Sequence, residues 1–214
     1  MTEFVTHDVK RFIISKPDAL HFIPGQASLL SVNETEWAEK KNPFTFTNLN
    51  NDSVLEFIIK KYEEHNGVTK KLHSLTAGDE ILIGEPFGTI NYKKKGVFIA
   101  GGAGITPFIA ILRELKEKGE IKGNQLIFSN KTWKDIILER EFKEMLGKDL
   151  SLILTREKIK GYDYGRVDEA YLKEKIKDFK QNFYICGPPA FLSDITEILE
   201  KLGADIQNII FEGK

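Results

Sequence analysis

The chain has 214 residues, which is enough for one large domain or two small ones with a substantial core. It is 41% hydrophobic and 29% charged, and 31 Lys and Arg residues nearly balance 32 Asp and Glu residues, for a formal net charge of -1. This balance argues against a protein whose main task is to grip a nucleic-acid backbone, because such proteins carry a clear basic excess. The short run Lys93-Lys94-Lys95 does not change this, and we interpret it as a solvated turn.

Cysteine and histidine limit the chemistry further. A single cysteine, Cys186, excludes an internal disulfide framework and a cysteine-ligated iron–sulfur cluster within this chain. The four histidines show no paired metal spacing, so we predict no metal site. Redox chemistry in this chain would therefore need an organic cofactor.

The first eight residues carry acids and lack the apolar core of a signal peptide. No apolar stretch approaches the length that spans a membrane. We therefore expect a cytoplasmic protein that does not contact a membrane.

Residues 1 to about 95 predict short strands separated by turns. The turn signals are Pro24-Gly25, residues 48–52 and Gly78-Asp79, and a short helix is predicted over 69–75. Such spacing predicts a closed antiparallel β-barrel. The predicted strands are 12–14, 27–32, 44–47, 54–59 and 80–83.

Beyond Gly96 the pattern changes to strands that alternate with amphipathic helices, which predicts a mostly parallel sheet with helices on both faces. We therefore predict two domains, a barrel over residues 1–95 and an α/β domain over residues 96–214. The predicted strands are 97–100, 125–128, 150–154, 183–186 and 209–211, and the predicted helices are about 108–119, 136–145, 169–179 and 190–202.

A glycine-rich segment, Gly101-Gly102-Ala103-Gly104-Ile105-Thr106-Pro107, lies between the first α/β strand and its helix. Glycines such as Gly102 and Gly104 let the backbone approach a pyrophosphate closely, while Thr106 can cap the helix and Pro107 can occupy its first position. The amides at that helix start would then face an anion. The alternative is a tight turn that binds no ligand.

The spacing of this segment departs from the usual dinucleotide fingerprint, because Pro107 stands where a third glycine is expected. The next strand ends in Ser129-Asn130-Lys131, without the acid that normally holds a ribose hydroxyl. A 2′-phosphate would therefore be tolerated, which favours NADPH over NADH.

Eight short motifs are distributed over essentially the whole chain. They are Phe22-Ile23-Pro24-Gly25-Gln26, Asn42-Pro43-Phe44-Thr45, Gly67-Val68-Thr69, Gly84-Glu85-Pro86-Phe87-Gly88, the glycine-rich segment, Thr155-Arg156, Cys186-Gly187-Pro188-Pro189 and Phe211-Glu212. Taken together and in this order, the motifs resemble the ferredoxin-NADP reductase family of flavin oxidoreductases, particularly its short bacterial flavodoxin and ferredoxin reductases.

The resemblance implies that Asn42-Pro43-Phe44-Thr45 holds FAD. In the family's Arg-x-Tyr-Ser/Thr motif, the arginine binds the phosphates, the aromatic ring covers the flavin, and the hydroxyl lies near its reactive nitrogen. Phe44 and Thr45 can still serve in this way, and Thr45 would be a catalytic residue. Asn42 cannot supply the charge-assisted bidentate contact that the family's arginine gives the FAD phosphates.

Two further segments would complete the flavin site by resemblance. Gly67-Val68-Thr69 corresponds to the family's pyrophosphate segment, and an anion there would offset Lys70 and Lys71 in the first helical turn. Lys60 and Tyr62, which follow the preceding strand, would contact phosphate or adenine. The alternative is that Lys70 and Lys71 are ordinary solvated surface residues and bind no anion.

For the nicotinamide nucleotide, the resemblance implies that Arg156 contacts the adenosine half. Arg166 is a second candidate for the same contact. It also places Cys186, Gly187 and Pro188 near the nicotinamide ring, with Cys186 as a positioning group in the catalytic centre. Glu212 would act as a proton relay near the flavin, although Lys214 replaces the family's terminal aromatic residue.

The implied activity is hydride transfer from NADPH (or NADH) to FAD, followed by electron transfer to a protein such as flavodoxin or ferredoxin. Thr45 and Cys186-Gly187 come from different domains and are expected to meet. We expect a monomer or weak dimer. The alternatives are a reductase of free flavin, the reductase component of an oxygenase, and a nucleotide-sensing module without turnover.

Overall fold

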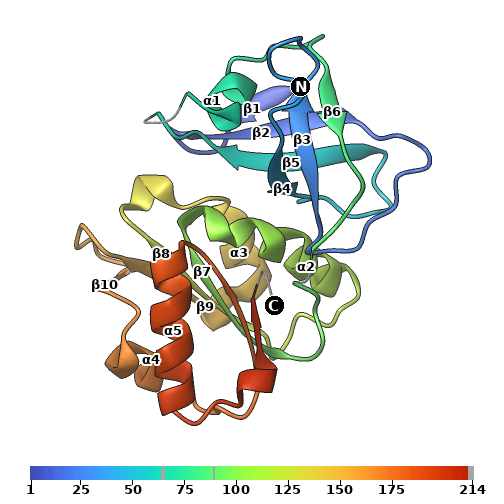
Figure 1. Ribbon diagram of the computed structural model, residues 1–214. Coiled ribbons are helices and arrows are strands. Elements are labelled where there is room, and N and C mark those ends of the chain that lie inside the picture. Colours follow the sequence, from blue (N-terminus) through green and yellow to red (C-terminus); the bar gives the residue numbers. More distant parts are fainter. Residues whose placement is uncertain (64–65, 89, 212–214) are drawn as a thin grey trace. The chain divides into compact units, whose positions relative to one another are not determined.

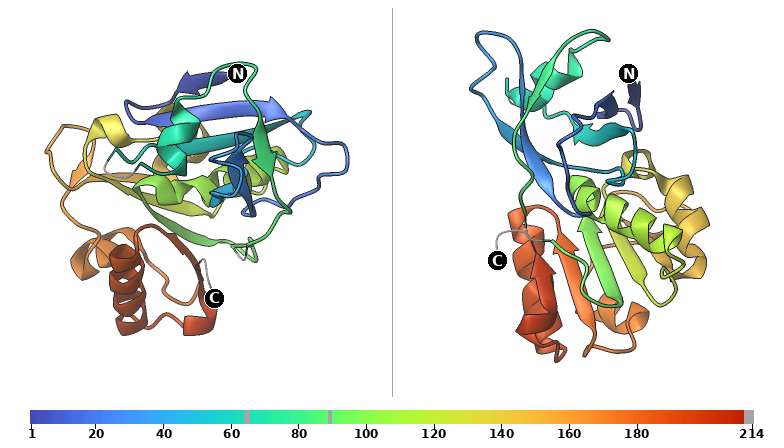
Figure 2. Two further views of the ribbon diagram at one scale, coloured as in Figure 1. Left: turned by 45° about the horizontal axis from the view of Figure 1, so that its top comes forward. Right: turned by 90° about the vertical axis from the view of Figure 1, so that its right-hand side faces the viewer.

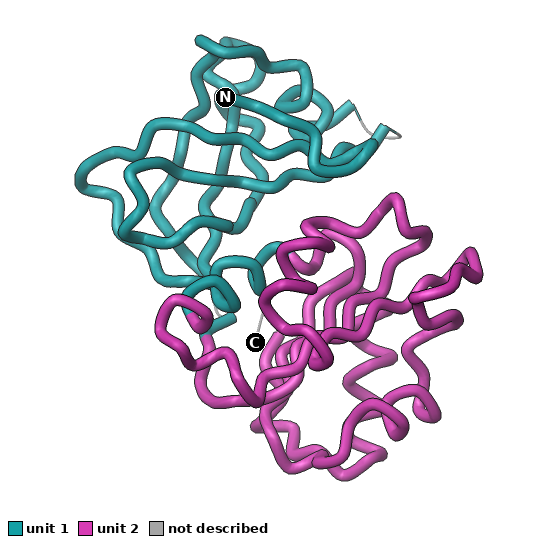
Figure 3. The backbone as a smooth tube through the Cα atoms, turned by 180° about the vertical axis from the view of Figure 1, so that it is seen from behind, with its two compact units in different colours: residues 1–91, 106–114 teal, residues 92–105, 115–214 magenta. Residues whose placement is uncertain are grey.

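The computed structural model describes residues 1–63, 66–88 and 90–211. It divides into two compact units, one made of residues 1–91 and 106–114 and the other of residues 92–105 and 115–214 (Figure 3). Helix α2 (Thr106–Glu117) therefore contributes residues to both units. The domain limits at residues 95 and 96 stay a prediction.

In the described part of the first unit, antiparallel strands form two sheets with the orders β1-β2-β5 and β4-β3-β6 (Figure 1). A bridge between Phe46 and Phe57 joins β5 to the segment that follows β4. This arrangement confirms the predicted antiparallel fold, and β1 is an addition to it. The strands are β1 (Thr2–Phe4), β2 (Val9–Ser15), β3 (Ala27–Val32), β4 (Asn42–Thr45), β5 (Val54–Lys60) and β6 (Ile81–Ile83).

Aromatic side chains fill the core of the first unit. Phe22 and Phe46 stack with their ring centroids 4.1 Å apart, and Phe46 packs against Phe57 at 5.1 Å. Helix α1 (Val68–His73) adds Val68 and Leu72 to the same cluster. Full burial of one such side chain stabilises the fold by about 1.5–3 kcal/mol.

A nearly buried carboxylate, Glu56 of β5, organises the charged groups of this unit. Arg113 of α2 donates to Glu56 Oε1 at 2.7 Å and to the carbonyl of Thr47 at 2.7 Å. The Nε of Arg11 forms an ion pair with Glu56 Oε2 at 3.3 Å, and the Thr47 hydroxyl donates to Oε1 at 2.8 Å. This cluster ties the part of α2 that belongs to the first unit to strands β2 and β5. Loss of one partner from a buried pair costs about 3–5 kcal/mol.

The second unit contains a parallel sheet of six described strands in the order β10-β9-β8-β7-β11-β12. The chain moves outward from β7 through β8 and β9 and then returns to β11 on the other side of β7, so the order reverses between β7 and β11. The strands are β7 (Gly96–Gly101), β8 (Gln125–Asn130), β9 (Leu150–Leu154), β10 (Asp163–Tyr164), β11 (Asn182–Cys186) and β12 (Ile209–Phe211).

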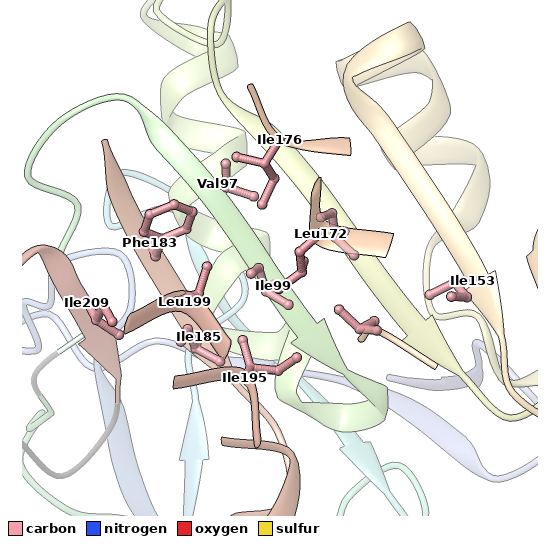
Figure 4. Close-up of a cluster of buried hydrophobic side chains, with 12 residues drawn as sticks. Val97, Ile99, Ile153, Leu172, Ile176, Phe183, Ile185, Ile195, Leu199 and Ile209 are labelled. Carbon is pink, nitrogen blue, oxygen red and sulfur yellow. The ribbon is translucent and has the colours of Figure 1, made fainter. Parts of the chain in front are cut away.

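Helices cover both faces of this sheet, as the alternation of strands and amphipathic helices along the sequence predicts. Side chains of α4 (Glu169–Lys175) and α5 (Pro189–Lys201) pack with one set of strand residues, including Ile99 and Ile185 (Figure 4). Helix α3 (Glu139–Leu146) lies on the opposite face from α5 (Figure 2), and its Phe142 contacts Phe128 of β8. These layers confirm the predicted α/β architecture.

Local backbone geometry moves two predicted helix boundaries. Helix α3 begins at Glu139 rather than near Ile136, because a 3₁₀ turn over Trp133–Asp135 and the left-handed Leu138 (φ 53°) precede it. Helix α4 ends at Lys175, four residues before Phe179, and Ile176 is already extended. None of the described helices is long and apolar enough to cross a membrane.

Tyr184 of β11 holds the segment that leads into β7. Its hydroxyl accepts hydrogen bonds from the amides of Lys93 (2.9 Å) and Lys94 (3.0 Å) and donates to the Lys94 carbonyl at 2.7 Å. Its fully buried ring stacks on Phe98 at 4.6 Å. The backbone of this lysine run is therefore anchored, while the lysine side chains are exposed.

Tyr184→Phe should lower the free energy of unfolding by about 1–3 kcal/mol, because it leaves these backbone groups without their partner. Denaturant unfolding of the purified protein measures the change. Tyr164→Phe is the matched control, because the Tyr164 side chain is exposed, and it should be neutral. An equal effect of the two substitutions would contradict this role for the Tyr184 hydroxyl.

Candidate functional site

The carboxyl ends of β7 and β11 form the centre of the candidate nucleotide site. They flank the reversal in strand order, where ligands bind in open α/β sheets. The glycine-rich segment begins at the end of β7, and Cys186-Gly187 begins at the end of β11. The structure thus brings together two motifs about 80 residues apart in the sequence.

Glycine is required here because the two strand ends approach through their backbones. A Cβ on Gly104 would lie 2.5 Å from the Cys186 carbonyl carbon and 2.6 Å from the Gly187 nitrogen. A Cβ on Gly187 would lie 2.7 Å from the Phe191 ring. At Gly102, by contrast, a Cβ would meet nothing within 4 Å, and its φ of 53° is left-handed. The turn is therefore tight on its inner side and open at Gly102.

The turn itself is a 3₁₀ helix over Gly102–Ile105 that continues directly into α2. Thr106 is the first residue of α2 and Pro107 the second, so Thr106 lies within the helix rather than capping it as the sequence predicts. The difference arises because the 3₁₀ turn already supplies the helical backbone ahead of Thr106. Amides at this start are suited to an anion, and the nucleotide roles of Gly102, Gly104, Thr106 and Pro107 stay predictions.

Cys186 is the last residue of β11 and is buried. Its carbonyl is the group against which Gly104 packs, so its backbone position is tightly defined. Pro188 immediately precedes α5. This geometry agrees with a positioning role for Cys186, Gly187 and Pro188, and contact with the nicotinamide ring stays a prediction.

The ends of β8 and β9 lie side by side next to this turn. The amide of Thr155 donates to the Asn130 carbonyl at 2.9 Å, and the amide of Arg156 donates to the Lys131 carbonyl at 3.0 Å. The side chains of Lys131 and Arg156 are both exposed. Two cations therefore flank the carboxyl edge of the sheet, where the usual dinucleotide fold places a ribose-binding acid.

Asn130 is a polar residue that the sequence-based prediction did not place in the site. The residue is 4% exposed, and neither its Oδ1 nor its Nδ2 has a hydrogen-bond partner among the described residues. Buried amides are rarely left unsatisfied, so an orphaned one beside a glycine turn fits a site that receives a polar ligand. The sequence shows only that an acid is absent at this strand end. It does not show that Asn130 is buried, because burial depends on the tertiary structure.

The candidate flavin motif occupies strand β4. Asn42 and Pro43 are exposed, whereas Phe44 and Thr45 are partly buried. Phe44 packs against the core cluster of the first unit, and β4 pairs with β3 through Thr45 and Ala27. An aromatic ring and a hydroxyl are therefore present for a flavin, but residue 42 presents a neutral amide in place of a cation.

The second predicted flavin segment opens α1, with Gly67 in the N-cap position and Val68 buried in the core. Val68 can therefore offer only its backbone, while Thr69 is partly exposed. The two helix lysines already have partners, because Lys70 donates to Asn66 at 3.0 Å and Lys71 pairs with Glu34 at 2.7 Å. A bound anion is thus not needed to offset them, and the segment's phosphate role stays a prediction.

Lys60 and Tyr62 differ in their availability. The Lys60 ammonium forms an ion pair with Asp8, and although burial raises the pKa of Asp8, this pair lowers it overall. Tyr62 is 47% exposed. A ligand at Lys60 would therefore compete with Asp8 for the lysine's charge.

Glu212 lies outside the described residues. Thr45 and Cys186 belong to different units, so their predicted meeting stays a prediction.

A cavity of about 620 Å³ lies elsewhere in the second unit, beside the amino ends of β8 and β9. Three of its charged groups are paired, since Lys175 contacts Asp163 at 2.9 Å and Glu174 at 3.2 Å. Because ligands of such sheets bind at the carboxyl ends, we do not assign the nucleotide to this cavity.

Gly104→Ala should impair folding and nucleotide binding more than Gly187→Ala. A methyl group added at position 104 would clash with backbone atoms, which cannot move without separating β7 from β11, whereas one added at position 187 meets mainly the side chain of Phe191. Thermal unfolding and titration with NADP⁺ measure the two effects. If Gly104→Ala were the milder change, the close approach would not be a constraint on this turn.

Comparison with protein families agrees with both halves of the chain. Residues 1–92 match the oxidoreductase FAD-binding domain, and residues 98–197 match the oxidoreductase NAD-binding domain. The two matches follow the order of the antiparallel and parallel units along the sequence. FAD and NAD(P)H are therefore the cofactors of these domains.

Two reductases are similar to this chain over most of its length. The chain is 26% identical over 212 residues to the reductase component of propane 2-monooxygenase from Rhodococcus jostii, covering 92% of this chain but only 56% of that protein. It is 27% identical over 218 residues to NADH-cytochrome b5 reductase 1 from Eremothecium gossypii, covering 93% and 76%.

The fold also matches a solved ferredoxin NADP⁺ reductase from Neisseria gonorrhoeae with bound FAD and NADP. The TM-score is 0.86 at 20% identity, and the match covers 98% of this chain and 94% of that structure. The paired domain matches, the order of the motifs and this shared fold lead to one conclusion. The chain belongs to the ferredoxin-NADP reductase-like family of FAD- and NAD(P)H-dependent oxidoreductases.

Proposed function

We propose that the protein takes a hydride from NADPH onto bound FAD and delivers electrons singly to a protein acceptor such as flavodoxin or ferredoxin. The observation that carries this proposal is the close approach of Gly104 to Cys186-Gly187 at the reversal of strand order, in a chain whose other half is a flavin-binding domain. The chemistry that bound FAD supplies is acceptance of a hydride and release of electrons one at a time.

The protein's own residues supply binding and orientation. In this proposal, the turn over Gly102–Ile105 binds the nucleotide pyrophosphate through its amides, and Cys186-Gly187 positions the nicotinamide ring. Phe44 covers the flavin, and Thr45 donates a hydrogen bond to its ring. Glu212 remains the proposed proton relay.

Two observations bear on the electron acceptor. Residues 1–91 contain nine Lys and Arg against 13 Asp and Glu, so this part of the chain is net acidic and does not by itself attract acidic carriers such as flavodoxin. The similarity to a monooxygenase reductase component favours a second candidate, in which the acceptor is an oxygenase component. A cytoplasmic location and a monomeric or weakly dimeric state stay predictions.

The purified protein with FAD should lose its visible flavin absorbance under anaerobic NADPH. Gel filtration beforehand separates a protein that retains FAD from a reductase of free flavin, because only the former stays yellow. Persistence of the flavin spectrum with both NADPH and NADH would overturn the proposed activity. Reoxidation by flavodoxin, ferredoxin or an oxygenase component at several ionic strengths then identifies the acceptor.

Arg156→Ala should raise the KM for NADPH at least about tenfold and change the KM for NADH little, because a charge-assisted hydrogen bond to a phosphate is worth about 1.5–3 kcal/mol. Steady-state kinetics with each cofactor measure the ratio. Arg140→Ala is the control, since its side chain is exposed on α3 and pairs with Glu144. Equal changes in both KM values would show that Arg156 does not read the 2′-phosphate.

Asn42→Arg should strengthen FAD binding about tenfold or more by adding a charged phosphate contact on β4. Fluorescence titration of flavin-free protein measures this. Asn33→Arg adds the same charge to another exposed position of the first unit and is expected to leave the affinity unchanged. If Asn42→Arg also left the affinity unchanged, the flavin phosphates would lie elsewhere.

A further inference from the structure

Glu56 of β5 is a nearly buried carboxylate with two arginine partners among the described residues. Its side chain is 12% exposed, and those of Arg11 and Arg113 are 22% and 20% exposed. Arg113 donates a hydrogen bond to Oε1 at 2.7 Å, whereas Arg11 forms an ion pair with Oε2 at 3.3 Å without a hydrogen bond from its Nε to any described residue. Arg113, on α2, is therefore the closer partner.

Arg113 also holds the segment that follows the candidate flavin motif. Its Nη1 donates to the carbonyl of Thr47 at 2.7 Å. Thr47 comes two residues after Thr45, and its amide and hydroxyl both donate to the Glu56 carbonyl at 3.0 Å. One guanidinium therefore links α2 to β5 and to the residues directly after β4, and all of these groups belong to the first unit.

Helix α2 connects this anchor to the glycine turn. The helix begins at Thr106, directly after the 3₁₀ turn over Gly102–Ile105, and Arg113 lies about 10 Å along its axis from that start. Residues 107–112 between them are all buried. Because a packed helix moves as a rigid element, a shift at Arg113 is transmitted to Thr106 and to the turn before it.

The chemistry of the cluster favours a role in position over a role in stability alone. Desolvation offsets much of the attraction between nearly buried charges, so apolar side chains in place of a whole cluster often stabilise a fold equally well. A planar guanidinium, by contrast, donates hydrogen bonds in fixed directions. The bonds of Arg113 to Glu56 and Thr47 therefore select one position of α2 on the strands of the first unit.

We propose that Arg113 is a positioning residue for the transfer of a hydride from NADPH to FAD. It acts through Glu56 and the Thr47 carbonyl, which hold the helix that follows the nucleotide turn to the strands that carry the flavin motif. This inference rests on the proposed function, in which the hydride leaves NADPH as NADP⁺ and reduces FAD. A misplacement of about 1 Å between reacting groups costs about a hundredfold in rate.

The test is anaerobic stopped-flow reduction of the FAD-saturated full chain over a range of NADPH concentrations, which separates the limiting rate from the Kd. Arg113→Met should lower the limiting rate about tenfold or more and change the Kd for NADPH by less than about twofold, because the helix shifts while the groups that bind the nucleotide remain.

Arg11→Met is the matched control. It removes the other arginine partner of the same carboxylate, but from β2 rather than from α2. Its melting temperature should fall as that of Arg113→Met does, while its limiting rate should stay within about twofold of wild type. Equal losses of rate in the two variants would reduce the effect to stability and overturn the inference.

If Arg113→Met does not fold, Arg113→Lys decides in its place. It keeps the charge, but its side chain is one atom shorter, so contact with Glu56 and Thr47 requires the helix to shift. Its limiting rate should also fall, and a wild-type rate would overturn the inference.

The two levels of the proposal fail differently. Reduction of wild type with an unchanged limiting rate in Arg113→Met would overturn the inference alone. If neither NADPH nor NADH reduced the wild-type protein, the proposed function would be overturned, and the inference with it.

Discussion

The backbone of Gly104 packs directly against the peptide that joins Cys186 to Gly187, and much of the second unit depends on this contact. It holds together the ends of β7 and β11, the two strands between which the order of the sheet reverses. Because no side chain fits in the gap, the position admits glycine alone. The turn continues as a 3₁₀ helix into α2, and at Gly102 it faces open space, where a ligand can approach the backbone.

Some cationic side chains are held in ion pairs within the protein, and others are exposed where a ligand could contact them. Glu56, Arg11 and Arg113 form a nearly buried cluster that stabilises the first unit, and Lys60 and Lys71 are held by Asp8 and Glu34. These cations support structure even where a flavin motif lies nearby. The exposed Lys131 and Arg156 stand at the end of the parallel sheet instead, where an anionic ligand is expected.

The structure therefore supports the candidate nucleotide site more strongly than the candidate flavin site. The nucleotide half has a tight glycine turn, a strand reversal and an orphaned buried amide in one unit. The flavin half has the partly buried Phe44 and Thr45, but its phosphate segment opens a helix of six residues whose lysines are already paired.

The sequence by itself determined the fold class, because the period of its apolar residues changes from strand-like to alternating strand and helix near residue 96. Strands 27–32, 150–154 and 209–211 have the predicted limits, since each is a short apolar run bounded by turn residues. The glycine turn was also predictable, because a glycine-rich segment between a buried strand and an amphipathic helix favours a tight turn.

Only the tertiary structure decided which polar groups are satisfied. The partners of Lys60 and Lys71 lie 52 and 37 positions away in sequence, and Glu56 meets Arg113 across 57 positions. The orphaned state of Asn130 likewise depends on the neighbours that bury it. Hydrogen bonding and burial are set by residues brought together from distant segments, and local sequence patterns carry no record of them.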